Sequence, residues 1–328
     1  IVARSAEAKT LGVAMGTPYH MAEKFLKQNN VQVFSSNYAL YGDMSQRVMQ
    51  VLADHAPRIE IYSIDEAFLD FEGLHFVDPG SFARRLVKTV YQQTGIPVSI
   101  GIAPTKTLAK IANRIAKKRG TPGSVFDLSG PHQQRLEVLN ALDVADVWGI
   151  GRRWSKHLHH AGIKTAGQLC RCDPKWIRQK FSVVAERIVT ELNGTPCLEL
   201  DDMTEPRKQI VCSRSFSARI SDWVNMRAAI SHHLCRAGEK LRAQHSCTSG
   251  VQVYIRTSPF DQNTPHYANA ATTILSEPTQ DSSTLIHAGI NALKQIFQPG
   301  FRYQKAGVML FDLTPQTILQ RSLFPSYG

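Results

Sequence analysis

The sequence lacks the features that mark several large classes of protein. It has no apolar run near the roughly 20 residues that a membrane-spanning helix needs, and it contains no internal repeat. Its six cysteines include no CxxC pair. Cys170 and Cys172, on either side of Arg171, have no second pair of ligands at the spacing of a zinc site. We therefore expect a soluble, cytoplasmic protein whose thiols stay reduced.

An initiator methionine and a charged-then-apolar leader are also missing. Ile1 is predicted to lie within a strand already, so we interpret the 328 residues as a piece of a longer protein. At roughly 150 residues per domain, this length predicts two or three domains. The net charge of +11, from 38 Lys and Arg against 27 Asp and Glu, favours a polyanionic partner such as nucleic acid.

The first 124 residues mix helical and strand patterns, which predicts an α/β unit. Asp43 is the expected N-cap of its first clear helix, and Pro57 follows the end of that helix. The predicted elements are a helix at 43–55, an antiparallel hairpin of strands at 59–62 and 67–71, a helix at 80–94, a strand at 98–102 and a helix at 105–119.

The rest of the chain divides into a helical part and an α+β part. Short helices broken by glycine and proline are expected from 125 to 196, and the acidic segment 198–207 is an expected tether. Beyond it the order is β-α-β-β-α-β, a split βαβ arrangement. Its predicted elements are strands at 209–217, 250–256, 268–275 and 303–311 and helices at 223–241 and 285–296. The fold class expected is therefore a multidomain chain of α/β and α+β parts.

Two adjacent acids, Asp65 and Glu66, interrupt the apolar context of the predicted hairpin. Neighbouring side chains on a regular strand point to opposite faces, so both acids can reach one site only at a turn or bulge. Two carboxylates there can hold Mg²⁺ for phosphoryl transfer by a pair of metal ions. The alternative is an ordinary solvated turn.

A basic helix follows, and it favours the functional interpretation of the acids. Between Pro104 and Gly120 there are six basic residues and no acid. One face of this helix is apolar, and the opposite face suits phosphates. The basic residues on that opposite face are Lys106, Lys110, Arg114 and Lys117. A solvated charged face is the alternative.

A glycine-containing loop in the helical part predicts a helix-hairpin-helix that grips DNA. The glycines permit a tight turn, and amides at the start of the next helix attract a backbone phosphate. Thr165 and Gln168 can form a capping box on a following helix. The loop residues expected to bind DNA are Gly149, Ile150, Gly151, Arg152 and Arg153. A plain connection between helices is the alternative.

The first strand of the α+β part carries Ser213, Arg214 and Ser215. Hydroxyls and an arginine on a strand can follow a phosphate backbone, so we expect these three residues to bind DNA. The alternative is a polar edge strand that protects the sheet from aggregation.

Taken together, five segments make the chain resemble the UmuC branch of the Y-family translesion DNA polymerases. They are YSIDEAF, TKTLAKIANRIAKKRG, VWGIGRR with AGIKT, CSRSF and RYQKAGVML, and in order they span nearly the whole chain. The resemblance implies fingers at 1–36, a palm at 37–124, a thumb with the helix-hairpin-helix at 125–197, a linker at 198–207, a little finger at 208–313 and a tail at 314–328.

The resemblance also implies roles for single residues. Asp65 corresponds to a metal ligand and Glu66 to a metal-linked catalytic acid, with two Mg²⁺ ions as cofactor. Lys117 and Lys9 would contact the incoming triphosphate, and Arg4 would assist. Many relatives have a tyrosine and an arginine where this chain has Ala6 and Lys9, so the chain departs from that pattern in the fingers.

The implied activity is template-directed DNA synthesis across damaged DNA during the SOS response, with primer-template DNA and deoxynucleoside triphosphates as substrates. The family's opening strand, which carries another metal-binding aspartate, would precede Ile1, so we expect these 328 residues alone to extend primers negligibly. UmuD'-like subunits and RecA are implied partners through a C-terminal extension that would follow Gly328. The alternative function is a non-catalytic DNA-binding fragment.

A short tail motif resembles the one by which bacterial polymerases dock onto the sliding clamp. It consists of Gln320, Leu323 and Phe324, with Arg321 where an aliphatic residue is often found. We expect it to bind the clamp. The alternative is that Leu323 and Phe324 pack on their own domain.

Overall fold

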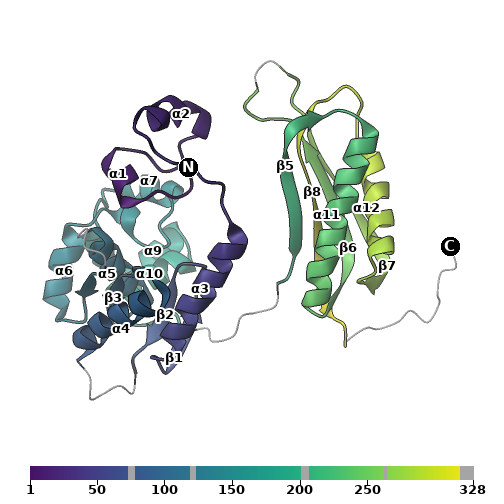
Figure 1. Cartoon of the computed structure of the whole chain (residues 1–328). Helices are drawn as coiled ribbons and strands as arrows, with labels where there is room; N and C mark the ends of the chain where they lie inside the picture. Colours follow the sequence, from purple (N-terminus) through teal and green to yellow (C-terminus); the bar gives the residue numbers. More distant parts are fainter. Residues whose placement is uncertain (73–77, 119–122, 201–206, 262–263, 318–328) are drawn as a thin grey trace. The chain divides into compact units, whose positions relative to one another are not determined.

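The computed structural model describes residues 1–72, 78–118, 123–200, 207–261 and 264–317. The chain forms two compact units, Ile1–Met203 and Thr204–Gly328, and each is described by itself (Figure 1). No helix of the described residues has the length and apolar character needed to cross a membrane.

The first unit begins with two helices, α1 (Ala6–Thr10) and α2 (Tyr19–Gln28), around a small apolar cluster. Ser5 caps α1 by accepting a hydrogen bond from the Ala8 amide at 3.2 Å. The prediction of a strand at Ile1 is wrong: the residue precedes α1 outside any strand, and its amino group donates to the Thr17 carbonyl at 2.7 Å.

Helix α3 (Tyr38–Ala53) begins five residues before the predicted helix. Its N-cap is Asn37, whose side chain accepts from the Leu40 amide at 3.1 Å, rather than Asp43. Asp43 instead pairs with Arg47 one turn later, at 3.0 Å. The other elements of this part are β1 (Arg58–Ile61), β2 (Ala67–Asp70), α4 (Pro79–Thr94), β3 (Ile100–Ile102), α5 (Lys106–Lys118) and β4 (Val125–Asp127).

These strands form two separate pairs. Strands β1 and β2 are antiparallel, as predicted, whereas β3 and β4 are parallel. Helices α3 and α4 bury an apolar cluster together with residues of β2 and β3. Gly101 lets α5 lie directly on β3, because a Cβ there would come within 2.1 Å of the Asn113 backbone nitrogen. Helix α5 is therefore held close to the strands.

The helical part of the first unit packs on the other face of α5. Leu108 and Ile111 of α5 share one core with Leu139, Ile177 and Leu192. The predicted capping box is confirmed. The Thr165 side chain accepts a hydrogen bond from the Gln168 amide, and the Gln168 side chain accepts one from the Thr165 amide. The elements are α6 (His132–Asn140), η1 (Val144–Asp146), α7 (Arg152–His160), α8 (Ala166–Cys170), α9 (Pro174–Lys180) and α10 (Val183–Leu192).

The second unit has the predicted β-α-β-β-α-β order. Its antiparallel sheet runs β5-β8-β6-β7, and two helices cover one face of that sheet (Figure 1). The last strand extends to Pro315, which pairs with Ser246, so it ends later than the sequence pattern predicted. The elements are β5 (Ile210–Ile220), α11 (Trp223–Ala243), β6 (Ser246–Arg256), β7 (Ala268–Thr279), α12 (Ser282–Ile296) and β8 (Tyr303–Pro315).

Candidate active site

The two adjacent acids lie at the turn between β1 and β2, as predicted. The amides of Tyr62 and Ser63 both donate to the Glu66 carbonyl at 3.0 Å, which closes the turn. The Ser63 hydroxyl donates to the Asp65 carboxylate at 2.7 Å. Both acids line one cavity of about 700 Å³, together with residues of β2, β3 and α5. The turn therefore places both acidic residues in the lining of one cavity.

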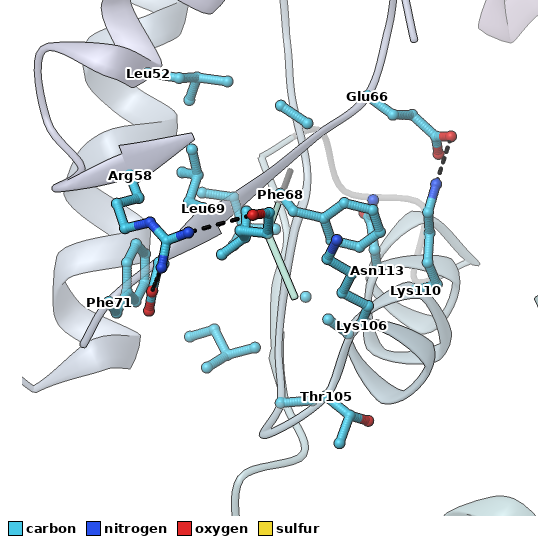
Figure 2. A pocket seen from close by; sticks show the side chains of 18 of the residues that line it. Leu52, Arg58, Glu66, Phe68, Leu69, Phe71, Thr105, Lys106, Lys110 and Asn113 are labelled. Atoms are coloured by element: carbon cyan, nitrogen blue, oxygen red, sulfur yellow. Dashed lines mark hydrogen bonds and ion pairs between the residues drawn. The ribbon is translucent and has the colours of Figure 1, made fainter. Parts of the chain in front are cut away.

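Helix α5 presents lysines to the acidic turn. The Lys110 ammonium lies 2.7 Å from Glu66, and this ion pair is visible in Figure 2. The Lys117 ammonium lies 3.5 Å from the same carboxylate. A second hollow of about 480 Å³ includes Glu66 and both lysines in its lining. Lys117 is thus beside Glu66, and the triphosphate contact that the resemblance implies for it stays a prediction.

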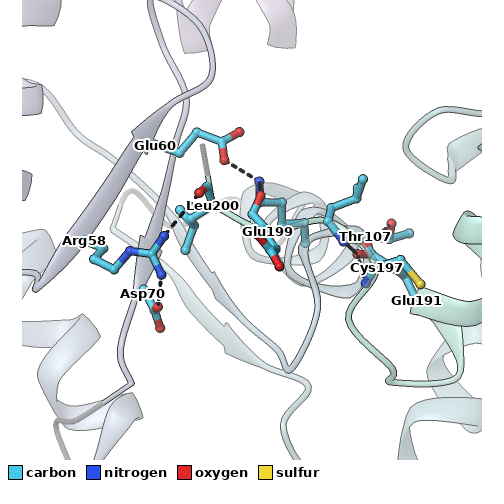
Figure 3. A network of polar contacts seen from close by, with 10 residues as sticks. Arg58, Glu60, Asp70, Thr107, Glu191, Cys197, Glu199 and Leu200 are labelled. Atoms are coloured by element: carbon cyan, nitrogen blue, oxygen red, sulfur yellow. Dashed lines mark hydrogen bonds and ion pairs between the residues drawn. The ribbon is translucent and has the colours of Figure 1, made fainter. Parts of the chain in front are cut away.

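Not all of the predicted basic face is directed at the acidic turn. Lys106 pairs with Glu60 of β1 and donates to the Glu199 carbonyl at 2.6 Å, at the end of the first unit. Arg114 pairs with Asp146 of η1. Figure 3 shows Glu60 and Glu199 beside the same polar network. These two cations of the helix therefore also stabilise contacts within the unit.

The glycine-containing loop lies between η1 and α7. Gly149 has a φ of +87°, a backbone conformation that favours glycine. A Cβ there would also lie 2.8 Å from the Ile188 side chain, so the position has no room for a larger residue. Ile150 is buried and anchors the loop to the core. Gly151 is the N-cap of α7, whose first residues, Arg152 and Arg153, are exposed. The loop thus has the exposed cations and helix start that a phosphate contact requires.

The three polar residues of β5 do not all share a face. Ser213 and Ser215 alternate with Arg214, so the serines lie on one face and the arginine on the other. Cys212, on the same face as Arg214, is buried in the core beneath the helices. Burial lowers the pKa of the His233 imidazole on α11, and the charges of His232 and Arg214 lower it further.

The remaining predicted site residues are separate from the acidic turn. Arg4 donates to the Val13 carbonyl, and Lys9 is exposed in the last turn of α1. Among the described contacts, none joins either of them to Asp65 or Glu66. The predicted clamp-binding residues, Gln320, Leu323 and Phe324, lie outside the described residues.

The donor set of the acidic turn suits a hard cation. Mg²⁺ prefers carboxylate and other oxygen ligands, and Asp65 and Glu66 offer two carboxylates on one cavity. In the described part of the chain, no group of three or more His, Cys, Asp or Glu residues is placed to hold a metal ion. Asp65 and Glu66 by themselves would supply only part of the ligands of such an ion.

The family follows from comparison with known proteins. Residues 1–114 match the impB/mucB/samB family, and residues 207–323 match the C-terminal domain of that family. UmuC of Salmonella typhimurium is 48% identical over 327 residues, covering 99% of this chain and 77% of that protein. The chain belongs to the impB/mucB/samB family. MucB of Escherichia coli, another member, is 41% identical over 332 residues, covering 100% of this chain and 79% of that protein.

More distant similarity extends beyond the impB/mucB/samB proteins. DNA polymerase IV of Brucella melitensis is 27% identical over 289 residues, covering 86% of this chain and 61% of that protein. A solved Y-family DNA polymerase chimera of Dbh and Dpo4 superposes with a TM-score of 0.72 at 19% identity, covering 96% of this chain and 87% of that one. The fold is thus that of a Y-family DNA polymerase, which confirms the fold and family predicted from the sequence.

Proposed function

We propose that this impB/mucB/samB family chain carries the catalytic site of a DNA-directed DNA polymerase that synthesises across damaged template bases during the SOS response. The observation that carries the proposal is the acidic turn, where Asp65 and Glu66 share a cavity with the lysines of α5. Its substrates are primer-template DNA and deoxynucleoside triphosphates. Primer extension by the full-length protein, with and without the two carboxylates, tests it.

The reaction assigned to this site is nucleotidyl transfer. Asp65 and Glu66 would supply some of the ligands of two Mg²⁺ ions. Such ions activate the attacking 3'-hydroxyl and stabilise the leaving pyrophosphate. Lys117 is 54% exposed and lies 3.5 Å from Glu66, so an incoming triphosphate can attract it away. Lys110 would then remain as the partner of Glu66. Lys9 of α1 and Arg4, which precedes that helix, are proposed to contact the triphosphate.

The domain assignments follow from the same proposal. We assign residues 1–36 to the fingers, the region predicted at 37–124 to the palm, that at 125–197 to the thumb, 198–207 to the linker, that at 208–313 to the little finger and that at 314–328 to the tail. Strand β4 extends the palm assignment to Asp127, and β8 extends the little finger to Pro315. The DNA contacts are assigned to the loop at 149–153 and to Ser213 and Ser215 of β5. Arg214, which was predicted to join them, lies on the opposite face of that strand. We place the protein in the cytoplasm, with UmuD'-like subunits and RecA as further partners.

Replacing Arg152 and Arg153 together by Gln is expected to weaken duplex binding without any change in sequence preference. Each lost phosphate contact removes about 0.9 from the slope of log affinity against log salt, so the slope should fall by about two. Fluorescence anisotropy with labelled DNA over a range of salt concentrations measures it.

The matched control replaces Arg84 and Arg85, an adjacent exposed pair on α4, by Gln. This control also removes two positive charges, but at a place outside the loop, so the slope should stay nearly unchanged. Equal slopes for the two double variants would contradict the DNA-binding role of the loop.

Replacing Leu323 and Phe324 by Ala is expected to abolish binding of the full-length protein to the sliding clamp. Two large apolar residues in a tail motif need a pocket, and tethering to the clamp would raise the local concentration of the polymerase at primer ends. Calorimetry or a pull-down with purified clamp measures the binding. Tyr327→Ala, in the same tail, is the matched control. Equal clamp binding by the double variant and the control, or unfolding of the double variant, would count against this tether.

A further inference from the structure

The ammonium of Lys110 lies inside a box of three aromatic rings. It is 4.2 Å from the ring centroid of Tyr62, 5.3 Å from that of Phe68 and 5.7 Å from that of Trp148. The side chain is only 13% exposed. A cation within about 6 Å of an aromatic face is attracted to it, and the attraction strengthens when water is excluded. Three rings around one ammonium therefore restrict where it can lie.

The rings also pack against one another. The centroids of Tyr62 and Trp148 are 5.6 Å apart, and each of these rings is 5.8 Å from Phe68. The Trp148 indole N–H donates to the Tyr62 hydroxyl at 3.3 Å. Tyr62 and Phe68 flank the acidic turn, whereas Trp148 directly precedes Gly149. The box is thus a packed unit that joins the acidic turn to the glycine-containing loop.

The remaining side of the box is the carboxylate of Glu66, which lies 2.7 Å from the Lys110 ammonium. The rings carry no formal charge, so of these four partners Glu66 is the one that forms an ion pair with Lys110. Lys117 also approaches Glu66, but it is 54% exposed and lies 3.5 Å away. Of these two lysines, the one held in place by rings is Lys110.

We propose that Lys110, held by Tyr62, Phe68 and Trp148, is a positioning residue that fixes the carboxylate of Glu66. The inference rests on the proposed function and concerns how the acid of that site is oriented. Lys110 acts through Glu66 and needs no contact with substrate. Its positive charge also repels a divalent cation near the same carboxylate. Removing the charge should therefore loosen Glu66 and at the same time tighten cation binding.

The test compares Lys110→Met and Lys110→Arg in the full-length protein. Methionine keeps an apolar stem in the box and loses the charge, so its affinity for Mn²⁺, a probe for Mg²⁺, should rise about fivefold. Its primer extension rate should fall about 100-fold, because a catalytic group displaced by about 1 Å loses that much. Arginine keeps the charge but not the shape, so Mn²⁺ affinity should stay close to wild type while extension falls.

Lys88→Met, at an exposed lysine of α4, is the matched control and should change neither measurement. Trp148→Leu removes one wall and leaves both charges, so extension should fall about tenfold with little change in Mn²⁺ affinity. This variant tests the box even if Lys110→Met fails to fold.

Mn²⁺ affinity is measured by electron paramagnetic resonance, without any reaction. If wild-type protein does not extend primers, the proposed function fails, and the Mn²⁺ shift alone then decides the role of Lys110. An Mn²⁺ affinity of Lys110→Met equal to that of Lys88→Met overturns the inference. So does wild-type extension by Lys110→Met.

Discussion

Replacing Glu191 by Gln is expected to lower the free energy of unfolding of the first unit by about 3 kcal/mol, because a buried carboxylate that accepts four hydrogen bonds would gain an amide group facing donors. Glu191 is 0% exposed. One of its oxygens accepts from the Thr107 amide at 2.9 Å and the Thr107 hydroxyl at 2.6 Å. The other accepts from the amides of Cys197 and Leu198, both at 3.2 Å.

These hydrogen bonds join three parts of the first unit, as Figure 3 shows. Thr107 lies in the first turn of α5, where backbone amides have no partner within the helix. Glu191 is on α10, and Cys197 lies in the segment that follows α10. The same segment is held at Leu200, whose carbonyl accepts from Arg58 at 3.2 Å. Glu191 therefore fixes the start of the helix that carries Lys110 and Lys117.

Chemical denaturation of the full-length protein measures the effect. Glu186→Gln is the matched control on the same helix, because Glu186 forms a surface pair with Arg178 at 3.1 Å. A surface pair of this kind contributes about 1 kcal/mol or less. Equal destabilisation by the two variants would mean that the buried hydrogen bonds of Glu191 contribute no more than a surface pair.

The sequence was sufficient to predict features that depend on local patterns. The acidic hairpin, the capping box at Thr165 and the order of elements in the second unit follow from alternation, helical spacing and capping residues. Element ends were less accurate: both Asn37 and Asp43 can cap a helix, and only the surrounding structure selects between them.

Contacts between distant residues could not be predicted in this way. Trp148 lies 86 residues from Tyr62, and Glu191 lies 84 residues from Thr107. A single glutamate in an amphipathic helix is normally exposed, so nothing local marks Glu191 as buried. Neighbouring residues of a strand point to opposite faces, so the sequence alone places Arg214 on the other face of β5 from Ser213 and Ser215. The prediction that all three bind DNA together did not take this alternation into account.

Replacing Asp65 or Glu66 by Ala is expected to reduce primer extension by the full-length protein at least about 10³-fold, because each change removes a carboxylate from the proposed metal site. Affinity for primer-template DNA should stay nearly unchanged, since the proposed DNA contacts lie on the loop at 149–153 and on β5. Asp43→Ala removes an exposed acid of α3 and is the matched control.

The most direct measurement is therefore primer extension across a damaged template base in Mg²⁺, with DNA affinity determined on the same preparations. We predict extension by the wild type and by Asp43→Ala, and DNA binding without extension by Asp65→Ala and by Glu66→Ala. Normal extension by either acidic-turn variant would contradict the assignment of the catalytic site. DNA binding without extension by the wild type itself would instead favour a non-catalytic DNA-binding protein.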